Sequence, residues 1–212
     1  MAVRLSRLVA VTIVVAAVAI VGWALFDSDD AGPETNLSSS TTEAVEAEPS
    51  NPTQPSLFAI EVPDLGPAPE IRNISGWLNT SGESFEEVRG EVTIVQFWTF
   101  GCSNCKATLP YLRDLYATRH DSGLEIIGIH AHEFDRERIP ENVVAAVADL
   151  DVTWPVALDT DKTNFRAWQG SRRFWPRTYV IDSQGRIRFD HIGEGAYEEL
   201  AATVDALLAE PG

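Results

Sequence analysis

The chain has 212 residues and only two cysteines, Cys102 and Cys105, which are separated by a serine and an asparagine. An apolar run, Val92–Trp98, precedes them, and a segment with helical spacing follows them. At such a strand-to-helix junction, free backbone N–H groups and the helix dipole favour the thiolate of the first cysteine. The second cysteine, one turn later, is shielded and can resolve a mixed disulfide. The spacing therefore indicates a dithiol that exchanges electrons with other disulfides.

A purely structural disulfide is the main alternative, because such bridges are common outside the cytoplasm. A bridge that closes so short a loop restricts the unfolded chain very little, however, so its entropic contribution is small. A zinc site would need two further ligands of matching geometry, and the chain has no second pair of cysteines. We therefore expect redox exchange with no metal and no cofactor.

The elements that must position the cysteines alternate along the chain. Strand-like runs occur at 74–79, 92–98, 124–130, 154–159, 177–182 and 186–191, and helix-like runs at 85–90, 102–116, 140–150, 162–168 and 196–208. Parallel strands joined by helices, followed by a hairpin around 183–185, predict an α/β fold. We expect a mixed central sheet flanked by helices on both faces.

The amino-terminal residues 1–26 have the pattern of a membrane anchor or a signal segment. The stretch from Leu8 to Phe26 carries no charge, and as a helix it would be about 30 Å long, enough to span a hydrocarbon core. Arg4 and Arg7 precede it and aspartates follow it, which orients the remainder of the chain away from the cytoplasm. We expect one membrane-anchoring helix and an extracytoplasmic domain, secreted if the helix is cleaved.

Residues 27–70 form a second compositional region, rich in Ser, Thr, Pro, Glu and Ala, with ten acidic residues and no basic one. Such a segment cannot bury enough apolar surface to offset its ordering entropy, so it is predicted to be a disordered acidic tether. The remaining residues, 71–212, are enough for one domain with its own core. The net charge of −16 argues against nucleic acid as a partner.

The segment 97–106, FWTFGCSNCK, with Pro110 five residues after the second cysteine, resembles the active-site strand and helix of thioredoxin. A second segment, 175–182, begins with Trp175 and Pro176 and resembles the other thioredoxin signature. This resemblance implies a thioredoxin-like fold. It also implies that Pro176 follows a cis peptide bond, lies against the dithiol and helps to orient a substrate strand.

The inserted helix and strand at 140–159 are similar to those of the TlpA/ResA-type membrane-anchored thiol-disulfide oxidoreductases. The pattern Trp-Thr-x-x-Cys-x-Asn-Cys at 98–105 and the segment HIGEGAY at 191–197 resemble the carboxy-terminal thioredoxin domain of DipZ-like proteins still more closely. The resemblance implies protein thiols and disulfides as substrates and, for a reductant, a CcdA-like membrane electron donor. An oxidant or isomerase of the same fold is the alternative.

One departure from thioredoxin concerns proton transfer. The strand before the thioredoxin dithiol carries a buried aspartate, and this chain has the neutral Gln96 there. Another proton acceptor is then required if deprotonation of Cys105 limits exchange. Glu133 matches a glutamate that TlpA/ResA-type proteins place near the dithiol, and we expect it to serve Cys105, with His132 as the second choice.

Further residues belong to the predicted site. Trp98, Phe100 and Trp175 could form an apolar rim for unfolded or extended substrates, although core packing accounts for Trp98 equally well. Lys106 follows the second cysteine rather than the first. The intervening Ser-Asn pair carries no fixed charge, so the sequence favours a reductant over an extreme oxidant.

Other protein classes fit less well. Thr99 and Cys102 have the spacing of a threonine and a peroxidatic cysteine, but the proline of that pattern would be residue 95, which is Val95. A copper site of the Sco type needs a wider cysteine spacing, even though His130, His132 and His191 are available. A non-catalytic binding or holdase module that keeps a stable disulfide remains the alternative from a different functional class.

Overall fold

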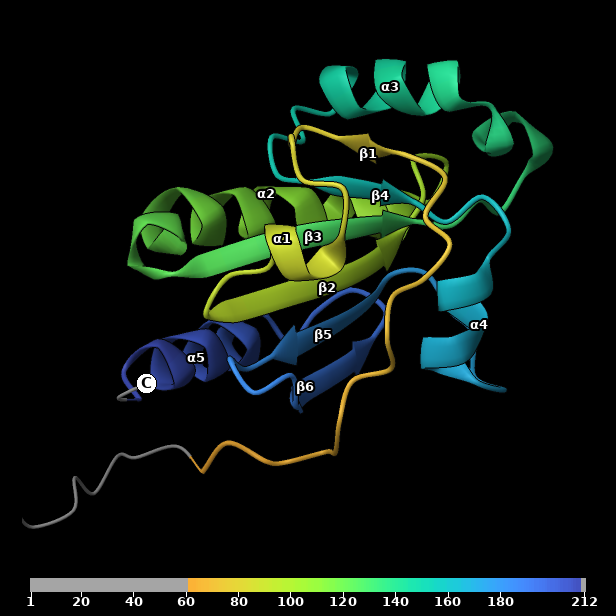
Figure 1. The fold of residues 1–212 in the computed structure, drawn as a ribbon. Helices are drawn as coiled ribbons and strands as arrows, with labels where there is room; N and C mark the ends of the chain where they lie inside the picture. Colours follow the sequence, from red (N-terminus) through yellow and green to blue (C-terminus); the bar gives the residue numbers. More distant parts are fainter. Residues whose placement is uncertain (1–60, 211–212) are drawn as a thin grey trace, which may run out of the picture. The chain divides into compact units, whose positions relative to one another are not determined.

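The structure is a computed structural model that describes residues 61–210. Its helices and strands follow the order that the sequence predicts (Figure 1). The strands are β1 (Trp77–Leu78), β2 (Val92–Trp98), β3 (Leu124–His130), β4 (Val156–Leu158), β5 (Arg177–Ile181) and β6 (Ile187–Ile192). The helices are α1 (Phe85–Val88), α2 (Ser103–Arg119), α3 (Pro140–Asp149), α4 (Thr163–Gln169) and α5 (Tyr197–Leu208).

The strands form one mixed sheet in the order β1-β4-β3-β2-β5-β6. β2 pairs in parallel with β3, and β3 in parallel with β4, whereas β1, β5 and β6 pair antiparallel with their neighbours. All seven residues of β2 are buried, as expected for a strand with neighbours on both sides and helices on both faces. The predicted mixed α/β sheet is confirmed.

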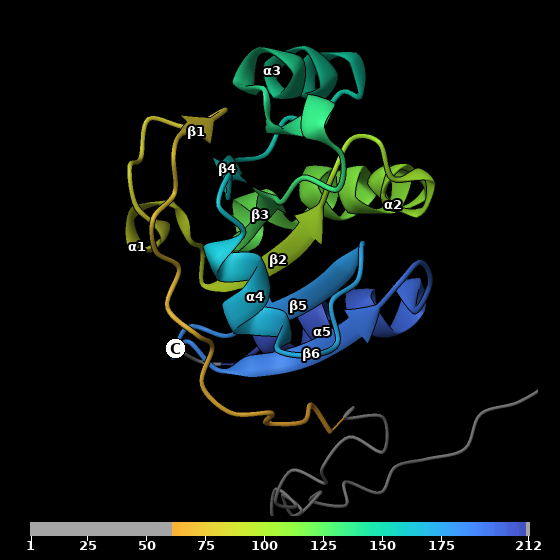
Figure 2. The ribbon, with the colours of Figure 1, turned by 90° about the vertical axis from the view of Figure 1, so that its right-hand side faces the viewer.

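Side chains of β2 alternate between two cores because successive residues of a strand point to opposite faces. Ile94 faces the core that α2, α3 and α5 cover, and Phe97 faces the core that α1 and α4 cover. Figure 2 shows α2 and α5 on one side of the sheet and α1 and α4 on the other. Leu109 and Leu112 of α2 are each 1% exposed, and burying such a side chain contributes about 1.5–3 kcal/mol. This packing fixes the start of α2 at the end of β2.

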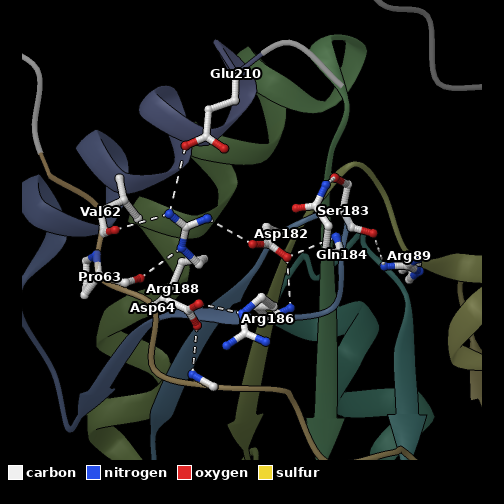
Figure 3. A network of polar contacts seen from close by, with 11 residues as sticks. Val62, Pro63, Asp64, Arg89, Asp182, Ser183, Gln184, Arg186, Arg188 and Glu210 are labelled. Carbon is white, nitrogen blue, oxygen red and sulfur yellow. Dashed lines mark hydrogen bonds and ion pairs between the residues drawn. The ribbon is translucent and has the colours of Figure 1, made fainter.

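The segment 62–68 runs along the outer edge of β6. The N–H groups of Leu65 and Ala68 donate to the carbonyls of Ile187 (2.8 Å) and Gly185 (2.9 Å). Arg188 donates to the carbonyls of Val62 and Pro63 (Figure 3). The sequence predicts that these residues belong to the acidic tether. Amino-acid composition gives no information about the unpaired backbone N–H and C=O groups that an edge strand offers to a neighbouring segment. This segment belongs to the folded unit rather than to the tether.

None of the helices within residues 61–210 combines the length and the apolar character that crossing a membrane requires. The predicted anchor or signal segment, 1–26, and the tether up to residue 60 lie outside the described residues.

Candidate functional site

The cysteines lie where β2 passes into α2. Cys102 is the residue that caps the amino terminus of α2, with extended backbone, and its N–H donates to the carbonyl of Thr99 (3.3 Å). Cys105 lies in the first turn and is fully buried, whereas Cys102 is partly exposed. One sulfur can therefore meet a substrate, and the other lies behind it.

The backbone N–H of Cys105 points at the Sγ of Cys102 and donates to it at 3.2 Å. A hydrogen bond from the Cys105 thiol is the largest influence on Cys102 and lowers its pKa from 9.0 to about 7. Burial acts in the opposite direction on Cys105 and raises its pKa. The arrangement gives Cys102 the character of a nucleophile and keeps Cys105 protonated until it is needed.

Trp175 and Pro176 lie beside the end of the sheet that carries the dithiol. Phe97, next to the last residue of β2, pairs with Arg177, the first residue of β5. Pro176, which directly precedes Arg177, therefore lies at the end of the sheet where β2 passes into α2. The Trp175–Pro176 peptide bond is cis, and Pro176 is buried. Trp175 and Cys102 pack against the same apolar cluster. The loop and the dithiol thus share one apolar cluster at this end of the sheet.

Three contacts hold the side chain of Trp175 in place. Its indole N–H donates to the carbonyl of Ala131 at 2.8 Å, and its ring stacks on Phe165 with centroids 4.3 Å apart. The Nζ of Lys162 lies 5.3 Å from the centre of the Trp175 ring. Trp175 is therefore a fixed, partly exposed platform next to the cis proline.

Gln96 connects β2 to the active-site helix. Its Nε2 donates to Thr108 Oγ1 at 2.9 Å, and the Thr108 hydroxyl donates to the carbonyl of Cys105 at 2.7 Å. Gln96 is 1% exposed, so a neutral amide occupies this interior position. It anchors the backbone of the buried cysteine and supplies no ionisable group.

Trp98 is 1% exposed, and its ring packs edge-on against His130 at 5.6 Å between centroids. Of the two interpretations of Trp98, core packing is correct and the substrate rim is not.

Lys106 is exposed, and its backbone N–H donates to the carbonyl of Cys102 at 3.2 Å. It thus contributes a helical hydrogen bond at the site.

Glu133 lies on the exposed turn that follows β3. Its charge raises the pKa of both cysteines, which places it within electrostatic reach of the dithiol. His132 is partly buried, and burial is the main cause that lowers its pKa. Its Nδ1 has no hydrogen-bond partner among the described residues.

A buried polar cluster that the sequence does not predict lies behind the cysteine loop. Glu137 is 1% exposed, and its Oε2 accepts the N–H groups of Glu133 (2.7 Å) and Phe134 (3.0 Å). The Thr99 hydroxyl lies 3.3 Å from Nε2 of His130. His130 is 3% exposed, and burial lowers its pKa to about 4, so it is neutral near pH 7.

No pattern in the segment HEFDRERI signals this cluster. Its apolar residues Phe134 and Ile139 are 52% and 46% exposed, whereas the charged Glu137 is buried. Hydrophobicity therefore predicts the opposite of the side-chain burial that the structure shows in this turn. Nor do three His, Cys, Asp or Glu side chains gather as a metal site would require, anywhere within residues 61–210.

Comparison with known proteins agrees with this geometry. Protein DipZ of Mycobacterium bovis is 38% identical over 160 residues, which cover 73% of this chain but only 23% of DipZ. The thiol-disulfide oxidoreductase ResA of Oceanobacillus iheyensis is 28% identical over 135 residues, which cover 64% of this chain and 66% of ResA. The chain thus spans less than a quarter of DipZ.

Solved structures share the fold. The crystal structure of a thioredoxin-like superfamily protein aligns with a TM-score of 0.62 at 22% identity and covers 69% of this chain and 99% of that one. A thioredoxin-like protein in the oxidized form, solved in solution, aligns with a TM-score of 0.59 at 26% identity over 69% of this chain and 97% of that one. The AhpC/TSA family profile matches residues 68–190, which is more than half of the chain. The domain has a thioredoxin-like fold, and the chain belongs to the AhpC/TSA family.

Proposed function

We propose that the protein is an extracytoplasmic thiol-disulfide oxidoreductase that reduces disulfides in other proteins. The observation that carries this proposal is the pairing of a partly exposed Cys102, whose pKa is about 7, with a buried Cys105. The backbone N–H of Cys105 donates to the Sγ of Cys102. Relatives that are named thiol-disulfide oxidoreductases support the proposal.

The reaction has two steps. The Cys102 thiolate attacks one sulfur of a substrate disulfide, a mixed disulfide forms, and the other substrate sulfur leaves as a thiolate. Cys105 then loses its proton and attacks the Cys102 sulfur. The Cys102–Cys105 disulfide forms, and the second substrate sulfur is released. Two electrons pass from the dithiol to the substrate. Pro176 and its flanking backbone would orient the substrate strand.

Recharging the dithiol requires an electron donor. For a domain outside the cytoplasm, a CcdA-like membrane protein that passes electrons from cytoplasmic thiols would meet this need. The uncharged Ser-Asn pair between the cysteines supports the reducing direction. The apolar segment within residues 1–26 would hold the domain at the membrane, and the stretch up to residue 60 would be its tether.

The decisive experiment is disulfide exchange by the full-length chain in detergent micelles. We expect rapid reduction and reoxidation by dithiothreitol and catalysed reduction of insulin, with Cys102→Ser inactive in both assays. Failure of the wild-type protein to exchange with any dithiol would instead favour a binding or holdase module. Equilibration in glutathione buffers then gives direction, because thioredoxin-type reductants lie near about −270 mV and strong oxidants near about −120 mV.

The location of the domain needs a separate test. In intact cells, a membrane-impermeant maleimide should label Cys102 to the same extent as in lysed cells. Labelling only after lysis would refute an extracytoplasmic site, whatever the outcome of the exchange assays.

A further inference from the structure

We propose that Glu137 is a positioning residue of the dithiol, which supports the loop 99–102 from below and so keeps Cys102 in the geometry that its thiolate requires. The inference rests on the proposed exchange function, but it can be measured without it. Its basis is the way in which the two oxygens of one buried carboxylate are used.

The first oxygen, Oε2, holds the turn that follows β3. It accepts the N–H groups of Glu133 and Phe134, four and three residues earlier in the chain. Burial opposes ionisation of this carboxyl, but these two donors, together with Thr99 and His130, outweigh it, and the pKa of Glu137 is lowered. The group is therefore an anion at neutral pH, fixed to the backbone of its own turn.

The second oxygen, Oε1, lies against Gly101, the residue before Cys102. A Cβ on Gly101 would overlap Oε1, and it would come within 3.2 Å of Nη2 of Arg136. Oε1 is buried and has no hydrogen-bond partner among the described residues. The Thr99 hydroxyl is near enough to help lower the pKa of Glu137. The atom within hydrogen-bonding distance of this hydroxyl, however, is Nε2 of His130. The carboxylate is thus held by its own turn and packs against the backbone of Gly101.

Thr99 and Phe100 of this loop are held by their own side chains, since the Thr99 hydroxyl lies 3.3 Å from Nε2 of His130 and the Phe100 ring stacks on His130 with centroids 5.8 Å apart. The loop's first residue follows Trp98, whose carbonyl accepts the N–H of Ala131 at 3.0 Å. Its last residue, Cys102, donates to Thr99 at 3.3 Å. Between these points Gly101 has no side chain to anchor it, and it rests on Glu137. A shift of Gly101 would move Cys102 away from the N–H of Cys105.

The charge of Glu137 has little direct electrostatic effect on the two cysteines. The Glu133 carboxylate is among the main influences on both cysteines, and Glu137 is not. The ionisable groups that face Glu137 come from its own turn, from the end of β3 and from the start of α4: Glu133, Arg136, Arg138, His130, His132 and Lys162. Glu137 therefore acts on Cys102 through the position of the backbone.

The test is the pH profile of Cys102 alkylation by iodoacetamide, read by mass spectrometry on the full-length chain in detergent. Glu137→Ala should move the midpoint upward by about one unit, so that alkylation at pH 7 falls about fivefold, because the thiolate is the reactive form. Glu137→Gln keeps an oxygen for the two amides and should restore most of the rate. Glu133→Gln, which removes only a charge, should move the midpoint downward.

A purely structural role would lower the melting temperature of Glu137→Ala and leave its alkylation midpoint unchanged, which would overturn the inference. An equal shift in Glu137→Gln would overturn it as well, since charge rather than position would then be responsible. If Glu137→Ala does not fold, Glu137→Asp provides the same measurement. Its shorter side chain cannot reach both the amides and Gly101, and an unshifted midpoint would again refute the role. Insulin reduction by the wild type tests the proposed function independently.

Discussion

The buried thiol of Cys105 is the partner that makes the Cys102 sulfur acidic. Its backbone N–H donates to Cys102 Sγ at 3.2 Å, and the hydrogen bond from its side chain is the largest cause of the lowered Cys102 pKa. The two cysteines are therefore coupled before any substrate arrives, and the first prediction separates their contributions.

Replacing Cys105 should change the acidity of Cys102 according to whether the new side chain can donate. The wild-type alkylation rate should rise with pH through a midpoint at about 7 and level off above it, because the lowered pKa leaves Cys102 ionised at higher pH. In Cys105→Ala the midpoint should move toward 9.0, the ordinary value of the group. Cys105→Ser keeps an O–H donor and should stay nearer to the wild type. Identical profiles for the alanine and serine variants would contradict the hydrogen-bond explanation.

Glu133 remains the predicted proton acceptor for Cys105. Replacement by Gln should slow the release of product from a mixed disulfide formed at Cys102, while the attack by Cys102 is retained because its pKa is lower without the neighbouring charge. Stopped-flow fluorescence of single turnovers resolves the two steps. If the pH dependence of the Cys105 step is the same in Glu133→Gln and in the wild type, Glu133 is not the acceptor. His132→Gln is the matched control for the second candidate.

Much of this site could be predicted from the sequence because it depends on local patterns. A run that is apolar except for Thr93 and Gln96 identifies β2, and the strand-to-helix junction follows from where that run stops. Pro176 could be placed because its neighbours form a distinct motif. Glu137 could not, since its burial depends on backbone donors within its own turn and on the absence of a side chain at Gly101. The pairing of Leu65 with Ile187 likewise depends on an edge strand far along the chain.

Gly101 should be intolerant of even one added carbon. In Gly101→Ala the new methyl group overlaps a buried carboxylate oxygen, and overpacking of this kind costs about 1–3 kcal/mol. Urea unfolding followed by tryptophan fluorescence measures the loss. Gly76→Ala is the control, because its Cβ would meet only the Leu158 side chain at an ordinary 3.5 Å. A Gly101→Ala variant as stable as Gly76→Ala would mean that Glu137 yields easily.

Arg188 should control how firmly the segment 62–68 is attached. It donates to Asp182 at 2.9 Å, and Asp182 is only 5% exposed, so Arg188→Met leaves a buried carboxylate without its charged partner at a cost of about 1–3 kcal/mol (Figure 3). Hydrogen exchange at the Leu65 and Ala68 amides should become about tenfold faster, since 1.4 kcal/mol is a factor of ten in an opening equilibrium. Arg186→Met removes an ion pair with Asp64 whose side chains are 42% and 49% exposed, and such pairs contribute only about 0–1 kcal/mol. Equal acceleration in the two variants would show that the edge pairing with β6, rather than Arg188, holds this segment.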